Sequence, residues 1–362
     1  MSSSSVSVCY LGPPASFSHQ AARDIFAPRQ TPLPAPKDEK EAPPPVRLVP
    51  HPSFSSVFAA VQSSSAGSPV YGVVPFENSS TGCVVQLLDL LADREGRYGD
   101  IRVCAEYYLR VRHCLLGPKQ PLDTVGGGGG GGGKETNRED ALNRVGKLYT
   151  HPQAWGQCSA FLDRHFGGAE RHDVSSTSRA AEIVAQEEPP TSVDGRGTRA
   201  AIASQLAAEV YGLDVLQEGI EDQGDNVTRF FVLRTESNDG QQRHMAQVNQ
   251  VNAVDTATLN KWKSLISFTI DHAAPGALAD ALAIFRKHGF NLTSIDTRPS
   301  RLRPWHYIFF VECEQANKVN GAVDKAAVDG IMSDLGLLAY SCRHLGRWMD
   351  QLDQIEPENP SG

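Results

Sequence analysis

Four short segments of β character along the chain each end in a polar turn that leads into a helical pattern. These segments are 6–11, 70–74, 147–150 and 170–174, and their turns contain GPPASFSH, PFENSSTG, HPQ and SSTS. A strand followed by an amphipathic helix is the repeating unit of α/β folds. The first N–H groups of each helix have no partner within the helix, so they point at whatever lies above the strand and can bind an anion. The repeated unit therefore predicts an α/β fold with several polar turns of this kind.

A further polar turn follows Tyr211 and runs directly into the apolar segment VTRFFVL. Its centre places Asn226, Thr228 and Arg229 where a loop becomes a strand, which is a common place for ligand-binding residues. Arginine can grip a carboxylate or phosphate with two donors, and Thr and Asn add short hydrogen bonds. The segment predicts a small anion as ligand. Taken alone, the TRF tripeptide is more typical of a strand with a surface ion pair on Arg229.

Composition narrows the class of protein. The 362 residues are enough for two or three domains, and 34 basic against 42 acidic residues give a net charge of −8 without a dense basic block, which argues against a nucleic-acid surface. Seven scattered cysteines show neither CxxC spacing nor a disulfide framework, so we expect reduced core residues. No signal sequence or membrane-spanning run is visible, which predicts a cytoplasmic protein.

Two segments cannot contribute to a packed core. Residues 27–45 are dense in proline and charge, and residues 118–137 include eight consecutive glycines. Both are predicted to be flexible inserts, since glycine offers no side chain to pack and loses the most backbone entropy on ordering. The glycine run is not a phosphate-binding loop, because Lys134 is followed by Glu135 and the GxxxxGK[ST] spacing fails.

The remaining patterns complete the expected architecture. Residues 198–211 are predicted as an alanine-rich helix that ends at Gly212, and His151 at a helix start is either a ligand or base or, more commonly, a cap. After a polar linker, strands are expected at 265–270, 291–297, 306–312 and 338–345, with helices at 276–288 and 316–335. That βαββαβ order is the ferredoxin-like arrangement.

Together these segments resemble the prephenate dehydratase family. The resemblance rests on GPPASFSHQAA (12–22), VVPFENSSTGCVVQLLDLL (73–91), THPQAWGQC (150–158), SSTSRAAEIVA (175–185), RAAIASQLAAEVYGLDVL (199–216) and DNVTRFFVL (225–233). The C-terminal segment resembles an ACT domain of the phenylalanine-sensing kind, through Gly276-Ala277-Leu278 and Ile295-Asp296-Thr297-Arg298-Pro299. The resemblance covers about four fifths of the chain and leaves out the inserts and the ends.

The family fold implies a two-lobed catalytic domain of the periplasmic-binding-protein type (type II), with its active site in the cleft between the lobes. The catalytic domain would be 6–234, with a first lobe of 6–104 and 213–234 and a second lobe of 105–212. A linker at 235–261 and an ACT regulatory domain at 262–347 would follow. The implied activity is a carbon–oxygen lyase reaction of L-phenylalanine biosynthesis, in which prephenate loses water and carbon dioxide to give phenylpyruvate. It requires no cofactor and no metal.

The resemblance also implies roles for individual residues. The catalytic set would be Asn226, Thr228, Arg229 and Phe230. Thr228 would donate a hydrogen bond to the departing hydroxyl, because threonine is a poor proton source by pKa. Arg229 would bind a carboxylate or hold the loop, and Phe230 would pack the site. Glu77 is a candidate proton donor, or else it orients Asn78. The substrate-binding set would be Ser16, Phe17, Glu77, Asn78, Ser79, Ser80, Ser176 and Thr177.

The same resemblance implies feedback control by L-phenylalanine. The effector-binding set would be Gly276, Ala277, Leu278, Asn291, Asp296, Thr297, Arg298 and Pro299. In the family this site lies where two ACT domains meet, which implies a homodimer or homotetramer. Alternatively, Gly276 only eases a tight turn and Arg298 makes a surface ion pair.

Three positions depart from the family pattern, and two other functions remain open. Ala15-Ser16 stands for the usual Gly-Thr and Phe76 for Ile. Asp296-Thr297 stands for Glu-Ser, a shortening that could alter effector affinity. One alternative function is arogenate dehydratase, which would use the same site. The other is a solute-binding regulator without catalytic activity, since the fold does not fix the function.

Overall fold

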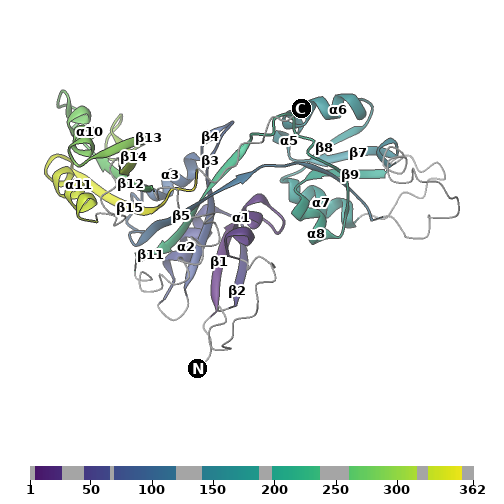
Figure 1. Ribbon diagram of the computed structural model, residues 1–362, viewed down its shortest axis with the longest axis horizontal. Helices are drawn as coiled ribbons and strands as arrows, with labels where there is room; N and C mark the ends of the chain where they lie inside the picture. Colours follow the sequence, from purple (N-terminus) through teal and green to yellow (C-terminus); the bar gives the residue numbers. More distant parts are fainter. Residues whose placement is uncertain are drawn as a thin grey trace.

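Two β-sheets organise the residues that the computed structural model describes, which are 5–26, 45–65, 69–119, 141–186, 198–236, 261–315 and 325–352. One sheet has ten strands and the other has five. In Figure 1 a first lobe occupies the middle of the molecule, a second lobe lies at one end and a C-terminal domain at the other. The predicted inserts and the predicted linker fall outside the described residues, apart from their ends.

The first lobe is a sheet with helices on both faces. Its strands are β1 (Val6–Leu11), β2 (Val46–His51), β3 (Val70–Asn78), β4 (Gly82–Cys83), β5 (Ile101–Arg110) and β11 (Val227–Thr235). Its helices are α1 (Phe17–Phe26), α2 (Phe54–Gln62) and α3 (Val85–Leu91). β1 runs parallel to β2 and β3, and β11 lies antiparallel between β3 and β5. Helix α1 covers one face, with Phe230 in that core, and α2 and α3 cover the other, with Phe231 in theirs.

The second lobe is built on the five-stranded sheet, in the order β10-β6-β9-β7-β8. Its strands are β6 (Cys114–Gly117), β7 (Val145–Thr150), β8 (Glu170–Asp173), β9 (Thr198–Ala203) and β10 (Asp214–Glu218). Its helices are α5 (Pro152–Gln157), α6 (Ser159–His165), α7 (Thr177–Gln186) and α8 (Gln205–Tyr211). β7 runs parallel to β8, as the strand–turn–helix units predict, and it also runs parallel to β9, which was not predicted as a strand.

The helix predicted over 198–211 is wrong in its first half. Residues 198–203 form strand β9, and only 205–211 are helical, ending at Gly212 in the left-handed conformation. Ala200 to Ala203 are fully buried between β6 and β7, where small side chains let α7 pack closely on the sheet. The helix propensity of alanine is a weak prior that such burial overrides.

The predicted lobe boundaries also shift. β5 pairs with β11 as far as Arg110, so residues 105–110 belong to the first lobe and the chain crosses at 111–113. β10 pairs with β6, so Asp214 to Glu218 belong to the second lobe. The sequence shows one long alternating segment from 101 to 116 that spans the crossing, and a strand pattern does not say which sheet a strand joins.

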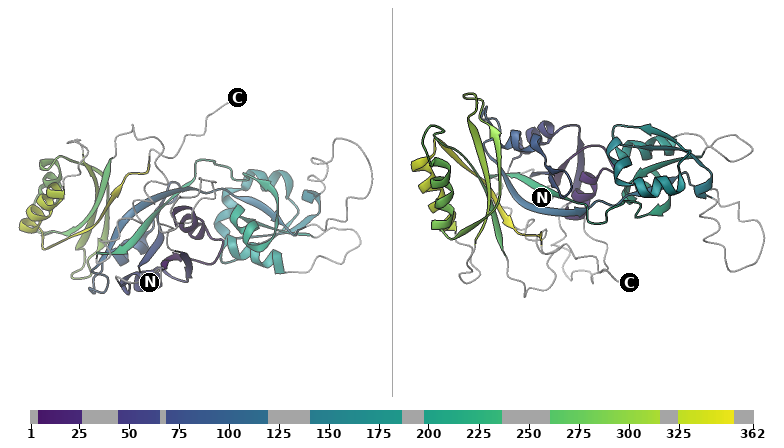
Figure 2. Two further views of the ribbon diagram at one scale, coloured as in Figure 1. Left: turned by 60° about the horizontal axis from the view of Figure 1, so that its bottom comes forward. Right: turned by 90° about the horizontal axis from the view of Figure 1, so that it is seen from above.

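The C-terminal domain has the predicted βαββαβ order. It comprises β12 (Trp262–Thr269), α10 (Ala277–Lys287), β13 (Phe290–Pro299), β14 (Tyr307–Gln315), α11 (Lys325–Leu338) and β15 (Ser341–Met349). Both helices pack on one face of its antiparallel sheet. The opposite face packs on the first lobe through Leu265, Phe310 and Trp348. Because β15 also pairs with β5 at a single position, one sheet continues from the lobe into this domain, as the two views of Figure 2 show.

Candidate active site

The ends of β3 and β11 bring three of the predicted residues together. Asn78 stands opposite Thr228 in the antiparallel pair. Its amide nitrogen donates to Thr228 Oγ1 at 3.0 Å and to Asn226 Oδ1 at 2.7 Å. Its amide oxygen accepts from the backbone N–H groups of Ser80 and Thr81 at 3.0 and 3.2 Å. Asn78 is therefore fixed from both ends, and it fixes the side chain of Thr228.

Ser79 joins the same junction through the backbone. Its N–H donates to the carbonyl of Val227 at 2.9 Å, and its hydroxyl accepts from the Val227 N–H at 2.9 Å. Asn226 is buried, which is consistent with a supporting position under the loop. Within the described residues the Thr228 hydroxyl accepts from Asn78 and donates to no protein acceptor. Its proton can therefore be donated to a ligand.

Ser16 caps the helix that follows β1. Its hydroxyl accepts from the His19 N–H at 3.2 Å and donates to the Leu11 carbonyl at 3.4 Å, so the predicted cap is confirmed. Phe17, the first residue of α1, lies edge-on to the ring of His113, 5.8 Å away, where the chain enters the second lobe. The turn after β1 therefore reaches the junction between the lobes.

The two lobes meet at this turn. The Pro14 carbonyl accepts hydrogen bonds from Ser178 Oγ of α7 and from the Tyr211 hydroxyl of α8, and the Ala15 carbonyl accepts from Ser204 Oγ. The start of α7, with Ser176 and Thr177, is thus held next to the turn that carries Ser16. Ser176 Oγ itself accepts from the Arg179 N–H at 3.0 Å, as a residue preceding a helix does. Two predicted polar turns, one from each lobe, therefore meet at the lobe junction.

His151 is a helix cap. Its Nδ1 accepts from the Gln153 N–H at 3.3 Å, immediately before Pro152 begins α5. Of the two predicted possibilities, the cap is the one that the structure shows.

Arg229 lies on the opposite face of β11 from Thr228, because successive side chains of a strand alternate. Its side chain is 7% exposed, and the guanidinium contacts Glu106 Oε2 from Nε at 2.8 Å and Glu312 Oε2 from a terminal nitrogen at 2.5 Å. Glu77 lies on the same face, and its Oε2 is 3.8 Å from a terminal nitrogen of Arg229. The carboxylates that Arg229 binds are therefore the protein's own, one from each domain.

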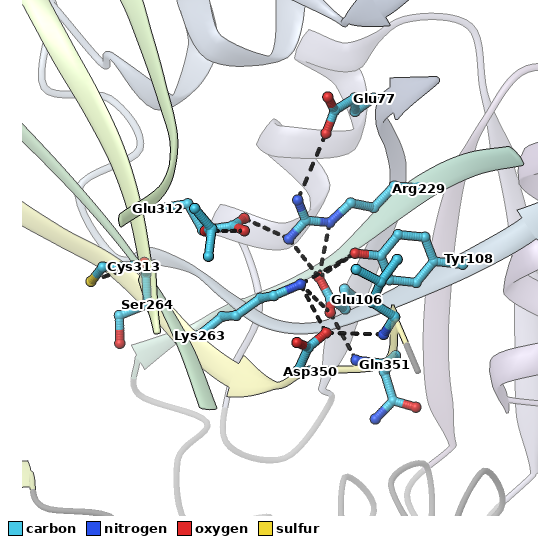
Figure 3. Close-up of polar contacts among 12 residues, drawn as sticks. Glu77, Glu106, Tyr108, Arg229, Lys263, Ser264, Glu312, Cys313, Asp350 and Gln351 are labelled. Carbon is cyan, nitrogen blue, oxygen red and sulfur yellow. Dashed lines mark hydrogen bonds and ion pairs between the residues drawn. The ribbon is translucent and has the colours of Figure 1, made fainter. Parts of the chain in front are cut away.

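A buried charge network surrounds this arginine between the first lobe and the C-terminal domain (Figure 3). Lys263 of β12 contacts Glu106 at 3.3 Å and Asp350 at 2.8 Å. The Gln351 N–H donates to the second oxygen of Glu106 at 2.9 Å. The aromatic rings nearest the guanidinium come from both domains and belong to Phe76, Tyr108, Phe231 and Trp348.

The network keeps its cations charged. Burial works against charge on Arg229, but Glu106 and Glu312 outweigh it and hold the pKa of the guanidinium above its ordinary value. Lys263 behaves in the same way, with burial opposed mainly by Glu106, and its pKa is also raised. Burial raises the pKa of Glu106, while Arg229 and Lys263 act in the opposite direction. Removing either cation would therefore raise the pKa of Glu106 further.

Glu106, Lys263 and Glu312 are not among the residues that the sequence predicts for the site. A signal was present, because each is a charged residue inside a strand otherwise rich in apolar residues: IRVCAEYYLR, WKSLISFT and YIFFVECEQ. A charge on the buried side of a strand needs a partner. The sequence does not tell which strands face each other, so it could not pair them.

The predicted effector residues divide between two faces of β13. Asp296 and Arg298 stand opposite Phe310 and Ile308, whose side chains face the first lobe, whereas Thr297 stands opposite Phe309 on the helix side. Burial, followed by the charge of Glu312, raises the pKa of Asp296.

At the end of β13 the C-terminal domain is tied to helix α3. Arg298 binds Asp89 of α3 with two bonds of 2.8 and 2.9 Å, and Arg94 donates to the Pro299 carbonyl at 2.9 Å. Arg298 therefore has a partner in the first lobe, in place of an isolated surface ion pair.

Of the remaining effector residues, Gly276, Ala277 and Leu278 lie at the start of helix α10, whereas Asn291 lies in β13. Gly276 precedes the helix with φ of +84°, a conformation that favours glycine. Ala277 and Leu278 pack on the core of the C-terminal domain, and Asn291 donates to Glu314 at 3.1 Å. Gly276 therefore does serve a tight turn, and the N–H groups of the residues after it lie at the start of helix α10.

The predicted residues do not enclose the cavity that the structure shows beside the connecting segments. This cavity measures about 540 Å³ and is lined in part by Gln20, Tyr107, Arg110, Gln205 and Glu218. Thr228 stands opposite Leu109, another lining residue, so the cavity is adjacent to the junction of β3 and β11 but is not part of it. No helix in the described part of the chain is long and apolar enough to cross a membrane.

The fold and the junctions described above define a two-lobed α/β ligand-binding domain joined to a βαββαβ domain. The family model for prephenate dehydratase matches residues 8–238, and the model for the ACT domain matches residues 271–327. The chain belongs to the prephenate dehydratase family. It is an enzyme of the lyase type, as the dehydratase relatives are, and its C-terminal domain is an ACT domain.

Individual relatives agree. The bifunctional chorismate mutase/prephenate dehydratase of Stutzerimonas stutzeri is 33% identical over 341 residues, which cover 94% of this chain and 72% of that protein. A solved prephenate dehydratase of Arthrobacter aurescens, in complex with L-Phe, has a TM-score of 0.63 and 22% identity, and the match covers 95% of this chain and 90% of that one. A solved quorum-quenching acylase, GqqA, has a TM-score of 0.64 and 22% identity over 96% of this chain and 99% of its own. Likeness at this level confirms the predicted fold class and does not by itself decide the activity.

Proposed function

We propose that the chain converts prephenate to phenylpyruvate, with release of water and carbon dioxide. The observation that supports this proposal is the Asn78–Thr228 contact, which holds a hydroxyl with no protein acceptor among the described residues next to the turn of Ser80 and Thr81. The membership of the family supplies the substrate class, and the geometry supplies a place where a hydroxyl group can leave.

The chemistry needs little from the protein. Breaking the bond to the ring carboxylate releases carbon dioxide, and its electron pair flows into the ring and expels the C4 hydroxyl, which leaves as water after taking up one proton. Formation of the aromatic ring drives this step, so the enzyme has to hold two carboxylates and stabilise the departing oxygen. No metal or cofactor takes part in the proposed reaction.

The proposed roles follow from the positions of the side chains. Thr228 donates to the departing oxygen, and Asn78 orients it by donating to its Oγ1. Ser16, Phe17, Ser79, Ser80, Ser176 and Thr177 form the polar turns that receive the substrate carboxylates. Glu77 lies on the face of Arg229 and away from Thr228, so it is not proposed as the proton donor. Phe230 supports the site from the first-lobe core, and Asn226 supports the loop.

The test is a side-by-side assay of purified protein with prephenate and with arogenate. We expect turnover of prephenate with a higher kcat/KM than arogenate. A preference for arogenate would assign the chain to arogenate dehydratase, and turnover of neither substrate would favour a solute-binding regulator.

L-Phenylalanine is the proposed effector, bound by the ACT domain of a homodimer or homotetramer in the cytoplasm. The solved relative that was crystallised with L-Phe supports this choice. The N–H groups that follow Gly276 at the start of α10 suit an amino-acid carboxylate. Inhibition requires that phenylalanine bind one arrangement of the subunits better than another. A coupling of about 1–3 kcal/mol would be ordinary for such a device.

Gly276→Val is expected to abolish inhibition of prephenate turnover by phenylalanine. Valine at φ of +84° is strained, and its side chain would stand at the carboxylate position. A matched control is Gly212→Val, which places the same side chain at φ of +69° in the second lobe, away from the ACT domain. We expect this control to keep its response to phenylalanine. Equal inhibition of the Gly276 variant and the wild type would place the effector elsewhere.

A further inference from the structure

Thr228 and Arg229 are neighbours on β11, and they face different parts of the molecule. Thr228 contacts Asn78 at the lobe junction, and Arg229 contacts Glu312 of the ACT domain. We propose that the Arg229–Glu312 ion pair carries the state of the ACT domain to Thr228. Arg229 is then a positioning residue, and Glu312 is its regulatory partner. This inference rests on the proposed function and adds the route by which the effector reaches the site.

The guanidinium is shared between two domains. Glu106, its partner in the first lobe, is fully buried, and Glu312, its partner in the ACT domain, is 3% exposed. Both contacts are at hydrogen-bond distance, and Figure 3 shows the two carboxylates converging on Arg229 from separate strands. A displacement of β14 therefore changes the forces on Arg229, while Glu106 keeps holding it to its own lobe.

A contact within the ACT domain links Glu312 to β13. The register of β13 and β14 slips between Leu292 and Ser294, which leaves Thr293 as an extra residue in β13. Thr293 Oγ1 donates to Glu312 Oε1 at 2.9 Å, on the carboxylate whose other oxygen holds Arg229. Bulges of this kind redirect a side chain. A displacement of the predicted effector segment of β13 can therefore act on the Glu312 carboxylate through Thr293.

Because the network contains one more carboxylate than cations, one carboxylate can be neutralised without leaving a cation in excess. The buried members of the network are two cations, Arg229 and Lys263, and three carboxylates, Glu106, Glu312 and Asp350. Glu312→Gln leaves two charges of each sign and preserves the shape of the side chain. Glu106 still holds the guanidinium, so the fold and the position of Thr228 in the absence of effector should be retained.

We expect Glu312→Gln to keep kcat and KM for prephenate within about threefold of the wild type and to reduce inhibition by saturating phenylalanine at least about tenfold. Phenylalanine binding, measured by calorimetry, should stay within about threefold, because the variant breaks transmission and leaves the binding residues in place. A residue with a merely structural role would lower thermal stability without separating binding from inhibition.

The matched control is Asp334→Asn in α11 of the same domain, where the carboxylate pairs with Lys287 and His288 and contacts neither the network nor the predicted effector residues. It should be inhibited like the wild type. Inhibition of Glu312→Gln equal to that of the wild type would overturn the inference, even if the wild type proves to be a prephenate dehydratase.

A second readout does not depend on turnover. Hydrogen–deuterium exchange of the 227–235 amides is expected to change when phenylalanine is added to the wild type, and to stay unchanged in Glu312→Gln. If the wild type turns over no prephenate, the proposed function fails, and this exchange experiment still decides the inference. Should Glu312→Gln fail to fold, Thr293→Val removes the contact to β13 without touching a charge. A full response to phenylalanine in that variant would overturn the inference.

Discussion

Thr228→Ala is expected to lower kcat for prephenate by about 10²–10³-fold, because it deletes the donor to the departing oxygen. The loss should fall on kcat with little change in KM, since the contact strengthens as charge develops on the leaving hydroxyl. Thr228 is partly exposed at the start of β11, and its side chain contacts only Asn78 among the hydrogen-bond partners that the described residues offer. The melting temperature should therefore change little.

Two variants sharpen this measurement. Thr228→Ser keeps the hydroxyl and should retain most of the activity, whereas Thr228→Val keeps the shape and should be as slow as the alanine variant. Turnover of Thr228→Val within a few fold of the wild type would remove Thr228 from the proposed mechanism.

Arg229→Met is expected to destabilise the folded protein by about 3–5 kcal/mol, because it leaves two buried carboxylates with too little counter-charge. Glu106 and Glu312 have almost no exposure to solvent, so water cannot replace the guanidinium. The measurement is the free energy of unfolding from urea titration. Arg97→Met is the matched control, because Arg97 pairs with Glu95 on the surface, and such pairs contribute about 0–1 kcal/mol.

The loss in Arg229→Met should depend on pH in a defined direction. Without Arg229 the pKa of Glu106 rises further above its value in the unfolded chain. Burial raises this pKa, and the charge of Lys263 would then oppose burial without the larger contribution of Arg229. A carboxyl whose folded pKa is raised contributes stability below its unfolded pKa and loses it as pH rises through the folded pKa. The deficit against the wild type should therefore be larger at about pH 8 than at about pH 5.5. A deficit that stays the same at both values would mean that Glu106 is not the group left unpaired.

Sequence patterns were sufficient where the determining interactions are local. The turn after β1, with Ser16 as helix cap, and the αL glycine after α8 follow from backbone geometry within a few residues. The same holds for the βαββαβ order of the C-terminal domain. Asn78 and Thr228 were both predicted as site residues although they are far apart in the chain, because Asn78 ends one strand, Thr228 begins another, and both lie in segments that resemble the family.

Other predictions were wrong where burial and strand pairing in the tertiary structure determine the secondary structure or the lobe. Residues 198–203 form a strand despite their alanine content, since they are buried at a central position of the second sheet, between β6 and β7. Residues 105–110 of β5 and the whole of β10 lie in the other lobe from the one predicted. The residue pattern of a single strand does not encode its pairing partners.

By itself the sequence determined the fold class and the family, and it supplied the polar turns that are proposed to bind the substrate. Only the tertiary structure decided what Arg229 does, because its role depends on which face of β11 it occupies and on two carboxylates far away in the chain. The same is true of Arg298, whose partner Asp89 lies in a different domain. Local patterns specify caps, turns and periodicity through short-range sterics and hydrogen bonds. The pairing of buried charges depends on how the domains pack. That packing rests on apolar contacts between residues that are far apart in the sequence.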